Sequence, residues 1–326
     1  MKNSVIIIGF LAALCTAIFR ALDNYVVHNL ILASDSLTAV LAYLVIGSWT
    51  GLITSIIFSI SFGNKLIDPD FKGIVFNNFE MHRQAFIAGS ISSGRTLFLL
   101  LGNQLGDPSV LIALASLTVL YTLLYDIWKK QTTLAQTILP LVLMTIGAVA
   151  SAFNGSIAIT ALGLFYVVII SNGLAACSEV IEQNGVRVSD SVNFFIWRFF
   201  WLAITGTAIA IVTSLLRGYS DLLVQTIYKS FAYLPWVITL MFFVFLGVGL
   251  KLYLKKTQAV SIVLLILSVQ IILGYPITLL GNLFKPGIFG NIPNDINIWA
   301  IRLIGSISIV LGIVLFQRSS QTEKYN

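Results

Sequence analysis

A single arginine interrupts one of the apolar segments of this sequence. In the stretch ISSGRTLFLLLGN, residues 91–103, Arg95 is surrounded by apolar and small residues. It lies about 11 residues into a predicted helix over 84–104, a depth of roughly 16 Å at ~1.5 Å per residue. That is near the middle of a hydrocarbon layer about 30 Å thick, where a guanidinium facing lipid costs about 2.5 kcal/mol or more. Arg95 should therefore face the protein interior or a cavity.

Two roles fit an arginine at this depth. It could anchor a carboxylate, a phosphate or another anionic group of a ligand. It could instead be structural, paired with helix-end carbonyl groups or with an acidic side chain such as Glu179. The two interpretations differ in whether Arg95 lines a central cavity or is sealed between helices.

Three further polar residues lie inside predicted helices. Gln270 is at the corresponding depth in the second half of the chain, where its amide could bind a polar ligand or join two helices. Asn172 and Tyr166 lie in the middle of a predicted helix over 157–178. Asn172 is the stronger candidate because an amide in lipid needs partners, whereas a tyrosine there suits packing. The predicted binding residues are therefore Arg95, Gln270, Asn172 and Tyr166.

Sequence motifs for catalysis or metal binding are absent. The two histidines, His28 and His82, are far apart, and there is no HExxH motif and no GxxxxGK[ST] loop for ATP. Cys15 and Cys177 fall in apolar segments, as small buried hydrophobic residues do. We expect no enzymatic activity, no cofactor, no metal and no nucleic-acid partner. The expected partners are a small-molecule substrate and the lipid bilayer, and the oligomeric state is left open.

The composition places these residues in a membrane protein. Of the 326 residues, 58% are hydrophobic and only 10% are charged, and the mean hydropathy is +0.95. A soluble domain carries roughly 25% charged residues. The N-terminal run MKNSVIIIGFLAALCTAIFR has an apolar core longer than that of a signal peptide, and further apolar runs follow. It is predicted to be the first membrane helix of an all-α integral membrane protein.

The apolar runs predict ten transmembrane helices. Their expected ranges are 4–22, 37–61, 84–104, 108–127, 134–153, 157–178, 193–215, 232–253, 258–280 and 297–316. One side of the membrane then receives Lys2, Lys65, Lys72, Arg83, Lys129, Lys130, Arg187, Lys251, Lys255, Lys256, Arg318 and Lys324, and the other receives Arg20, Arg217, Lys229, Lys285 and Arg302. This bias predicts that both termini are cytoplasmic.

Two predicted connections are longer than the rest. Residues 62–83 carry apolar side chains and a histidine at helical spacing, which fits either a short interfacial helix or an ordinary polar loop. Residues 281–295, rich in glycine, proline and asparagine, are predicted to form an external loop.

The chain shows a weak internal repeat. When 10–51 is laid over 165–206, the tripeptide at 34–36 (SDS) falls on the SDS at 189–191, before the second helix of each half. Residues 1–153 and 154–326 would then be two five-helix repeats. Because five is odd, the second repeat must enter the membrane from the opposite face. Inverted repeats are typical of secondary transporters, whose substrate site lies near the midplane between the halves.

Charged residues near the helix ends are candidate gates. Arg20, Asp23 and Asn24 close the outer end of the first predicted helix, and Glu179 and Glu182 close the inner end of the sixth. They could pair and separate as the protein alternates between two states, or they could be solvated helix ends. Arg198, near the start of the seventh helix, is expected to be mainly structural because its long side chain can reach the surface.

The sequence resembles the EamA-like members of the drug/metabolite transporter superfamily. The resemblance rests on the SDS-x6-Arg run ending at Arg198, on GNQLGDPSVLIALASLTVLY, and on the final helices TIGAV and VLGIV. It covers nearly the whole chain. The chain departs from the family at Thr118 and Ser268, which replace a usual proline, at Gln131, where an acidic residue is common, and at Tyr43, which matches Arg198.

The resemblance implies a permease working by alternating access, with a pathway lined by helices 1, 3, 4, 6, 8 and 9. The expected substrate is a small polar or amphipathic metabolite such as an amino acid, exported across a bacterial inner membrane. A nucleotide-sugar or lipid-linked sugar carrier is the alternative, and an intramembrane enzyme or sensor is the less favoured one.

Overall fold

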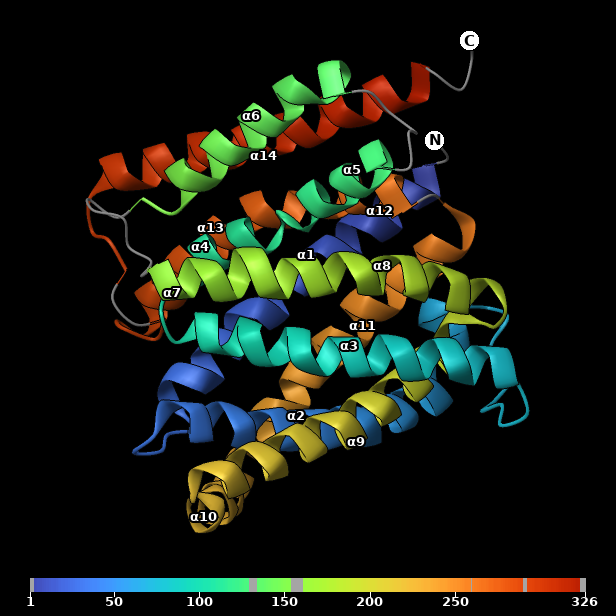
Figure 1. Ribbon diagram of the computed structural model, residues 1–326, viewed down its shortest axis with the longest axis vertical. Coiled ribbons are helices and arrows are strands. Elements are labelled where there is room, and N and C mark those ends of the chain that lie inside the picture. The colour runs from blue at the N-terminus through green and yellow to red at the C-terminus, as the bar shows by residue number, and fades with distance from the viewer. Residues whose placement is uncertain (1–2, 129–133, 154–160, 259, 290–291, 323–326) are drawn as a thin grey trace.

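The computed structural model describes residues 3–128, 134–153, 161–258, 260–289 and 292–322, and every regular element among them is helical (Figure 1). The elements are α1 (Asn3–Asn29), α2 (Ser36–Phe58), the π-helix η1 (Ser59–Ile67), α3 (Phe79–Asn103), α4 (Pro108–Ala115), α5 (Thr118–Trp128), α6 (Leu134–Ser151), α7 (Ala161–Leu164), the π-helix η2 (Phe165–Ser171), α8 (Asn172–Arg187), α9 (Ser191–Arg217), α10 (Ser220–Ser230), the 3-10 helix η3 (Phe231–Tyr233), α11 (Leu234–Thr257), α12 (Val260–Leu267), α13 (Val269–Phe284) and α14 (Ile296–Thr322).

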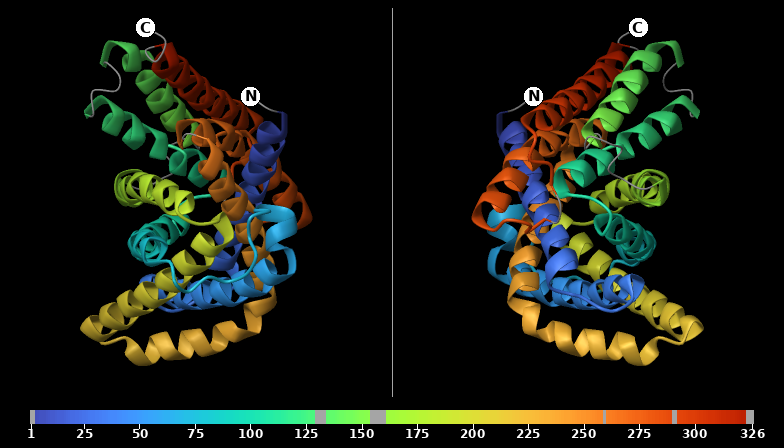
Figure 2. Two further views of the ribbon diagram at one scale, coloured as in Figure 1. Left: turned by 90° about the vertical axis from the view of Figure 1, so that its right-hand side faces the viewer. Right: turned by 90° about the vertical axis from the view of Figure 1, so that its left-hand side faces the viewer.

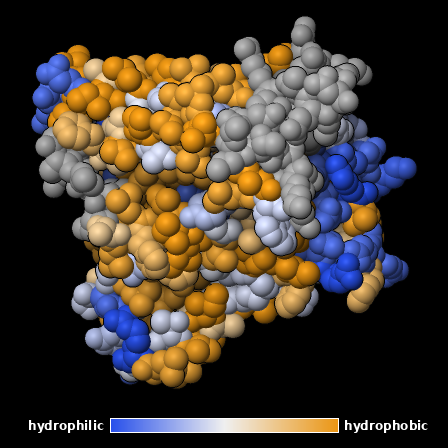
Figure 3. Space-filling view, turned by 45° about the horizontal axis from the view of Figure 1, so that its top comes forward, coloured by the Kyte–Doolittle hydropathy of each residue, from blue (hydrophilic) through white to orange (hydrophobic). Residues whose placement is uncertain are grey.

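The helices identify an integral membrane protein. Within the described residues, seven helical segments are long and apolar enough to cross a bilayer: Ser4–Asn29, Ser36–Ile67, Phe79–Asn103, Ala161–Arg187, Ser191–Arg217, Ser220–Thr257 and Ile296–Leu315. Three shorter apolar segments, Pro108–Thr122, Ile138–Ser151 and Val269–Phe284, lie where the fourth, fifth and ninth helices were predicted. In Figure 3 the visible face is apolar across its middle, and hydrophilic residues gather towards its left and right edges.

The two SDS tripeptides each cap the N-terminus of a helix, one in each half of the chain. Asp35 and Asp190 are the N-caps of α2 and α9, and each carboxylate accepts a hydrogen bond from a backbone N–H three residues on, at 2.9 Å and 2.8 Å. An aspartate N-cap of this kind is worth about 1 kcal/mol because it satisfies an otherwise free helix donor. The hydrogen bond from Arg217 is the main reason that the pKa of Asp35 falls to about 2.

Helices from the two halves of the sequence pack together. α6 and α14 lie side by side along one side of the bundle, at the top of Figure 1, and α2 packs on α9 towards the opposite side (Figures 1 and 2). Between these pairs, α1 packs on α11 and α3 on α8. The crossing of α6 and α14 is close because a Cβ on Gly147 would lie 2.5 Å from the backbone oxygen of Gly305.

Two helices that were predicted to be continuous are interrupted. The segment 108–127 breaks between α4 and α5 at Ser116–Leu117, and the segment 258–280 breaks between α12 and α13 at Ser268. These breaks occur next to Thr118 and at Ser268. The predicted sixth helix is also irregular in its middle, because the π-helix η2 directly precedes Asn172. Such π-helical insertions widen the helix and change which side chains face inwards.

The predicted connections differ in detail from the structure. Residues 68–78 form no helix, so the loop interpretation of 62–83 holds over that part, while η1 continues the preceding helix to Ile67 and α3 begins at Phe79. The segment 281–295 is helical as far as Phe284, where α13 ends. The sequence analysis did not predict α10, an 11-residue helix with exposed Val224 and Tyr228.

Candidate functional site

Two adjoining cavities occupy the middle of the bundle. The first, of about 90 Å³, is lined by side chains from α1, α3, α8, α9, α11 and the two interrupted helices. The second, of about 130 Å³, lies towards α2. Both are lined by Phe19, Arg20, Arg95, Arg198 and Val248, so the arginines stand at the boundary between them. These cavities are the candidate functional site.

Arg95 reaches the cavity without an ionic partner. Its side chain is half-buried and lines both cavities, and no hydrogen bond or ion pair joins its guanidinium to the residues that the structure describes. The structural interpretation required a partner such as Glu179, but Glu179 is paired with two lysines instead. Arg95 therefore presents its charge to the cavity.

Arg20 stands close to Arg95 on the same cavity wall. The two guanidinium groups are near enough to repel each other, and Asp23 and Glu179 offset part of that repulsion. The buried Nε of Arg20 has no hydrogen-bond partner among the described residues. A second cation beside an unpaired one is costly in a low-dielectric interior unless an anion joins them.

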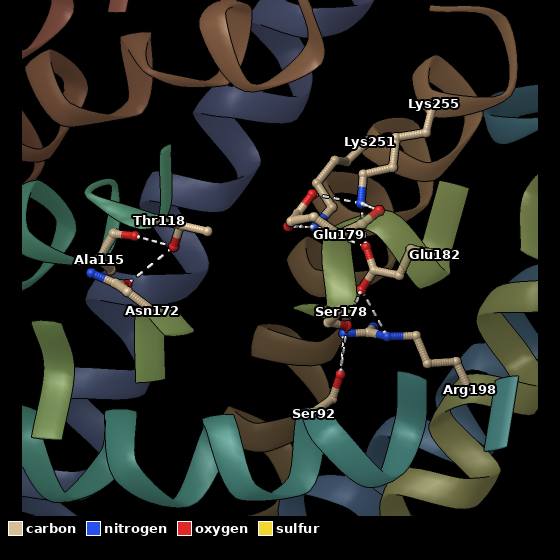
Figure 4. A network of polar contacts seen from close by, with 10 residues as sticks. All are labelled: Ser92, Ala115, Thr118, Asn172, Ser178, Glu179, Glu182, Arg198, Lys251 and Lys255. Carbon is tan, nitrogen blue, oxygen red and sulfur yellow. Dashed lines mark hydrogen bonds and ion pairs between the residues drawn. The ribbon is translucent and has the colours of Figure 1, made fainter. Parts of the chain in front are cut away.

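One end of the site is closed by a network of ion pairs (Figure 4). From α11, Lys251 and Lys255 face two carboxylates of α8. Lys251 Nζ lies 2.9 Å from Glu179, and Lys255 Nζ lies 2.6 Å from Glu179 and 2.5 Å from Glu182. Arg198 of α9 lies 3.1 Å from Glu182. Three helices are thus held together by alternating charges.

The same network extends to α3. Arg198 Nη2 donates to Ser92 Oγ at 2.8 Å, and Ser178 Oγ donates to Glu182 at 3.1 Å. Arg198 was predicted to be mainly structural, and its ion pair and hydrogen bond agree with that role. It also lines both cavities, which the prediction did not include.

The other end of the site is closed by polar contacts of α1. Asp23, which lines the second cavity, accepts a hydrogen bond from the Tyr43 hydroxyl of α2. The next residue, Asn24, and His28, just over one turn later, donate to the backbone oxygen of Asn103 at the end of α3. The C-terminal parts of α1 and α8 lie at opposite ends of the bundle, so the two closures flank the cavities (Figure 1).

The helix breaks place polar side chains at the first cavity. Ser116, Thr118, Ser268 and Gln270 all line it. Gln270 Nε2 donates to Ser116 Oγ at 3.3 Å and so connects the two interrupted helices. The buried Oε1 of Gln270 has no partner among the described residues. It is an acceptor available to a ligand.

The structure brings only some of the predicted residues together. Arg95, Gln270, Arg20 and Glu179 line the first cavity and Asp23 lines the second. Asn172 and Tyr166 line neither.

Contacts elsewhere occupy these last two side chains. Asn172 donates to Leu114 O at 2.8 Å and accepts from Thr118 Oγ1 at 3.1 Å, so its amide joins α8 to the first helix break. The Tyr166 ring packs against Phe98, with 5.6 Å between ring centroids.

Lys251, Lys255 and Glu182 contribute more to the site than the sequence indicated. Glu182 was grouped with Glu179 at a helix end and the two lysines were counted among the cytoplasmic charges, yet Lys251 lines the cavity and Lys255 is completely buried. A signal was present. Glu179 and Glu182 are three residues apart and the lysines four apart, so each pair shares one helix face and can meet the other pair.

A second buried ion pair lies away from the cavities. Arg302, counted among the charges on the external side, is fully buried in α14, and its Nη1 lies 2.8 Å from Asp107, the N-cap of α4. Its Nε also donates to Phe153 O at 2.7 Å. This pair fastens α14 to α4 and is structural.

Within the part of the chain that the structure describes, no three side chains form a metal-binding group. Gln131, one of the departures from the family pattern, lies outside the described residues. No model of a known protein family matches the chain, and no curated protein matches it.

Proposed function

We propose that this protein is a secondary transporter that moves a small metabolite across the membrane by alternating access, as its resemblance to EamA-like transporters implies. The observation that carries the proposal is a cavity in the middle of the bundle that holds two guanidinium groups, Arg20 and Arg95, without a full complement of anions. Ionisable groups inside membrane segments face cavities and mark substrate pathways.

The pattern of helix packing supports two inverted five-helix repeats. If 1–153 and 154–326 are equivalent, α1 corresponds to α8, α2 to α9, α3 to α11 and α6 to α14. A twofold axis then requires that α1 pack on α11 as α8 packs on α3, and that α3 pack on α9 as α11 packs on α2. Both pairs of contacts are present, and α2–α9 and α6–α14 pack on each other as self-paired helices must.

Further features agree with ten spans. α1 begins and α14 ends at the same end of the bundle (Figure 1), as an even number of crossings requires. The proposed boundary between the repeats directly follows Phe153. The next residues, 154–160, lie outside the described part of the chain. Cytoplasmic termini remain our proposal from the distribution of lysine and arginine in the loops.

The two closures on either side of the cavities serve as gates in this proposal. Alternating access requires that one closure open while the other stays shut. The contacts of Asp23 with Tyr43 and of Glu179 with Lys251 are polar and local, so each can be exchanged for contacts with water or substrate. An acid–base role in catalysis fits less well, because Glu179 and Glu182 are both held as counter-ions of lysine.

Transport is tested by counterflow in proteoliposomes. Vesicles loaded with an unlabelled amino acid or phosphate ester are given the labelled compound outside, and transient accumulation is measured. We expect accumulation with the wild type and a loss of more than ~90% with Arg95→Gln, since a charge-assisted contact is worth tenfold or more. The matched control is Arg83→Gln, on the same helix, whose side chain is 56% exposed. A protein that binds its ligand but shows no counterflow would contradict the proposal.

A further inference from the structure

We propose that the substrate is a dianion with a compact apolar body, such as a phosphate monoester, with its head group between Arg20 and Arg95. This inference rests on the proposed function, because it names the class of substrate that the same cavity would carry. It is argued from the charges, the unpaired groups and the shape of the two cavities.

The charges at the cavities do not balance. The charged side chains that line them or lie directly behind them are the cations Arg20, Arg95, Arg198, Lys251 and Lys255 and the carboxylates Asp23, Glu179 and Glu182. Five positive and three negative charges leave a formal excess of two. Uncompensated charge in a low-dielectric interior is strongly unfavourable. A ligand with two negative charges neutralises the site.

A zwitterion lacks a partner for its ammonium group. Glu179 is already in contact with Lys251 and Lys255, and Glu182 with Lys255 and Arg198. The remaining carboxylate, Asp23, accepts the Tyr43 hydroxyl and faces Arg20. Among the described residues that line the cavities, none of the carboxylates is free to receive a cation. An amino acid would also leave the two excess positive charges in place.

The guanidinium groups and one amide supply the recognition. Guanidinium forks match the oxygens of phosphate and carboxylate, and Arg20 and Arg95 approach the same space from α1 and α3. Gln270 of α13 also lines the first cavity, and its Oε1 has no hydrogen-bond partner among the described residues. It can receive a hydroxyl or N–H group next to the anionic head.

The lining of the second cavity is the reason for proposing an apolar body in the substrate. Beyond the arginines it is lined largely by apolar side chains, including Leu44, Leu100, Phe199, Leu202, Met241 and Val244. Arg20 and Arg95 lie at the junction of the two cavities, so a head group held there directs its substituent into this apolar space. With a volume of about 130 Å³, the space suits a ring or a short chain.

Four ligands that share a phenyl group test the charge directly. Phenyl phosphate, phenyl sulfate, phenylalanine and benzylamine are titrated against the purified full-length protein at about pH 8, well above the second phosphate pKa of ~6. Dissociation constants come from ligand-dependent thermal stabilisation. We expect phenyl phosphate to bind about ten- to hundredfold more tightly than phenyl sulfate, which has the same shape and one charge fewer. Equal binding of these two, or tighter binding of phenylalanine or benzylamine, overturns the inference.

Two arginine variants and one further ligand complete the test. Arg20→Gln and Arg95→Gln each remove one positive charge, so we expect the preference for phosphate over sulfate to fall about tenfold while phenyl sulfate still binds. Arg83→Gln should keep the wild-type preference. Inorganic phosphate should bind more weakly than phenyl phosphate. Equal binding of the two would overturn the inference that the substrate has an apolar body.

These binding measurements need no transport. Dianion binding without counterflow would leave the inference intact and contradict the transporter. Counterflow of an amino acid without dianion binding would support the transporter and overturn the inference of a dianionic substrate.

Discussion

Lys255 Nζ lies 2.5 Å from a carboxylate oxygen of Glu182, and both side chains are completely shielded from solvent. Lys255 belongs to α11 and Glu182 to α8, so the pair joins helices from the central part of the bundle. Buried charges are tolerated only when they are paired, because the loss of hydration otherwise dominates. This pair is the centre of the ion-pair network of α8, α9 and α11 that closes one end of the cavities.

Replacing Lys255 should strongly destabilise the protein. Lys255→Met removes a charge but keeps much of the side-chain volume, leaving Glu182 and Glu179 close together with fewer counter-ions. Breaking a buried ion pair on one side costs about 3 to 5 kcal/mol. We expect a large fall in the melting temperature in detergent, measured by intrinsic fluorescence.

The matched control for this variant is Lys65→Met. Lys65 is exposed on η1, and substitutions of such surface residues usually change stability by no more than about 0.5 kcal/mol. Adding Glu182→Gln to Lys255→Met should restore part of the lost stability, because it removes the uncompensated carboxylate. Equal effects of the two lysine variants would show that the buried pair does not have the assigned importance.

The contact between α6 and α14 should not tolerate a methyl group. A Cβ on Gly305 would lie 2.7 Å from the backbone oxygen of Gly147, and backbone atoms cannot move aside as a flexible side chain can. Overpacking of this kind costs about 1 to 3 kcal/mol. Gly305→Ala should therefore lower the melting temperature. Gly173→Ala is the control, since its Cβ would have its nearest contact at 3.7 Å, and it should be neutral or stabilising. A neutral Gly305→Ala would contradict this packing.

Local sequence signals predicted the apolar helices but not the closure of the site. Run length and hydropathy located the apolar segments, and the SDS tripeptides precede two helices that Asp35 and Asp190 cap. The depth of Arg95 indicated a residue that faces the protein interior. In contrast, Lys251 meets Glu179 across 72 residues of sequence, and the four-residue spacing of the two lysines shows that they share a helix face but not that this face is buried.

The helix breaks were also invisible in the sequence. No proline or glycine marks Ser116–Leu117 or Ser268. The break after α4 is accommodated by a distant contact, because Asn172 donates to the backbone oxygen of Leu114 in the last turn of that helix. Tertiary hydrogen bonds of this kind replace part of the helical pattern and leave no periodic signal. That contact also gives the Asn172 amide partners within the protein, whereas Gln270 Oε1 has none among the described residues.

The ion pair between Asp35 and Arg217 should make stability depend on pH in acid. The pKa of Asp35 is lowered from 3.8 to about 2, chiefly by the hydrogen bond from Arg217. A lowered carboxyl pKa in the folded state contributes stability that is present above the unfolded value and is lost as the pH falls through the folded value. The melting temperature of the wild type should therefore fall between about pH 4 and pH 2.

Asp35→Asn isolates this contribution, because asparagine still caps a helix but cannot pair with Arg217. The variant should lose less stability than the wild type over the same pH range, and Arg217→Gln should behave like it. The measurement is thermal unfolding at a series of acidic pH values. Parallel curves for the wild type and both variants would show that the pair contributes no pH dependence.

Asn172 and Gln270 should separate a structural amide from a ligand-binding one. Both groups of the Asn172 amide are occupied, by Leu114 O and Thr118 Oγ1, whereas Gln270 Oε1 has no partner among the described residues. Asn172→Leu leaves buried polar groups unsatisfied, so it should lower the free energy of unfolding by about 1 to 3 kcal/mol. It should leave the preference for phenyl phosphate over phenyl sulfate unchanged.

Gln270→Leu tests the other half of this contrast. It removes one hydrogen bond to Ser116 but also the acceptor that faces the cavity. We therefore expect a small loss of stability together with weaker binding of phosphate esters that carry a hydroxyl group, and little change for phenyl phosphate, which has none. Glycerol 3-phosphate and phenyl phosphate, titrated against both variants and the wild type, provide the comparison. If Asn172→Leu alters this ligand preference and Gln270→Leu does not, the amide that serves the cavity is Asn172 of α8 and not Gln270 of α13.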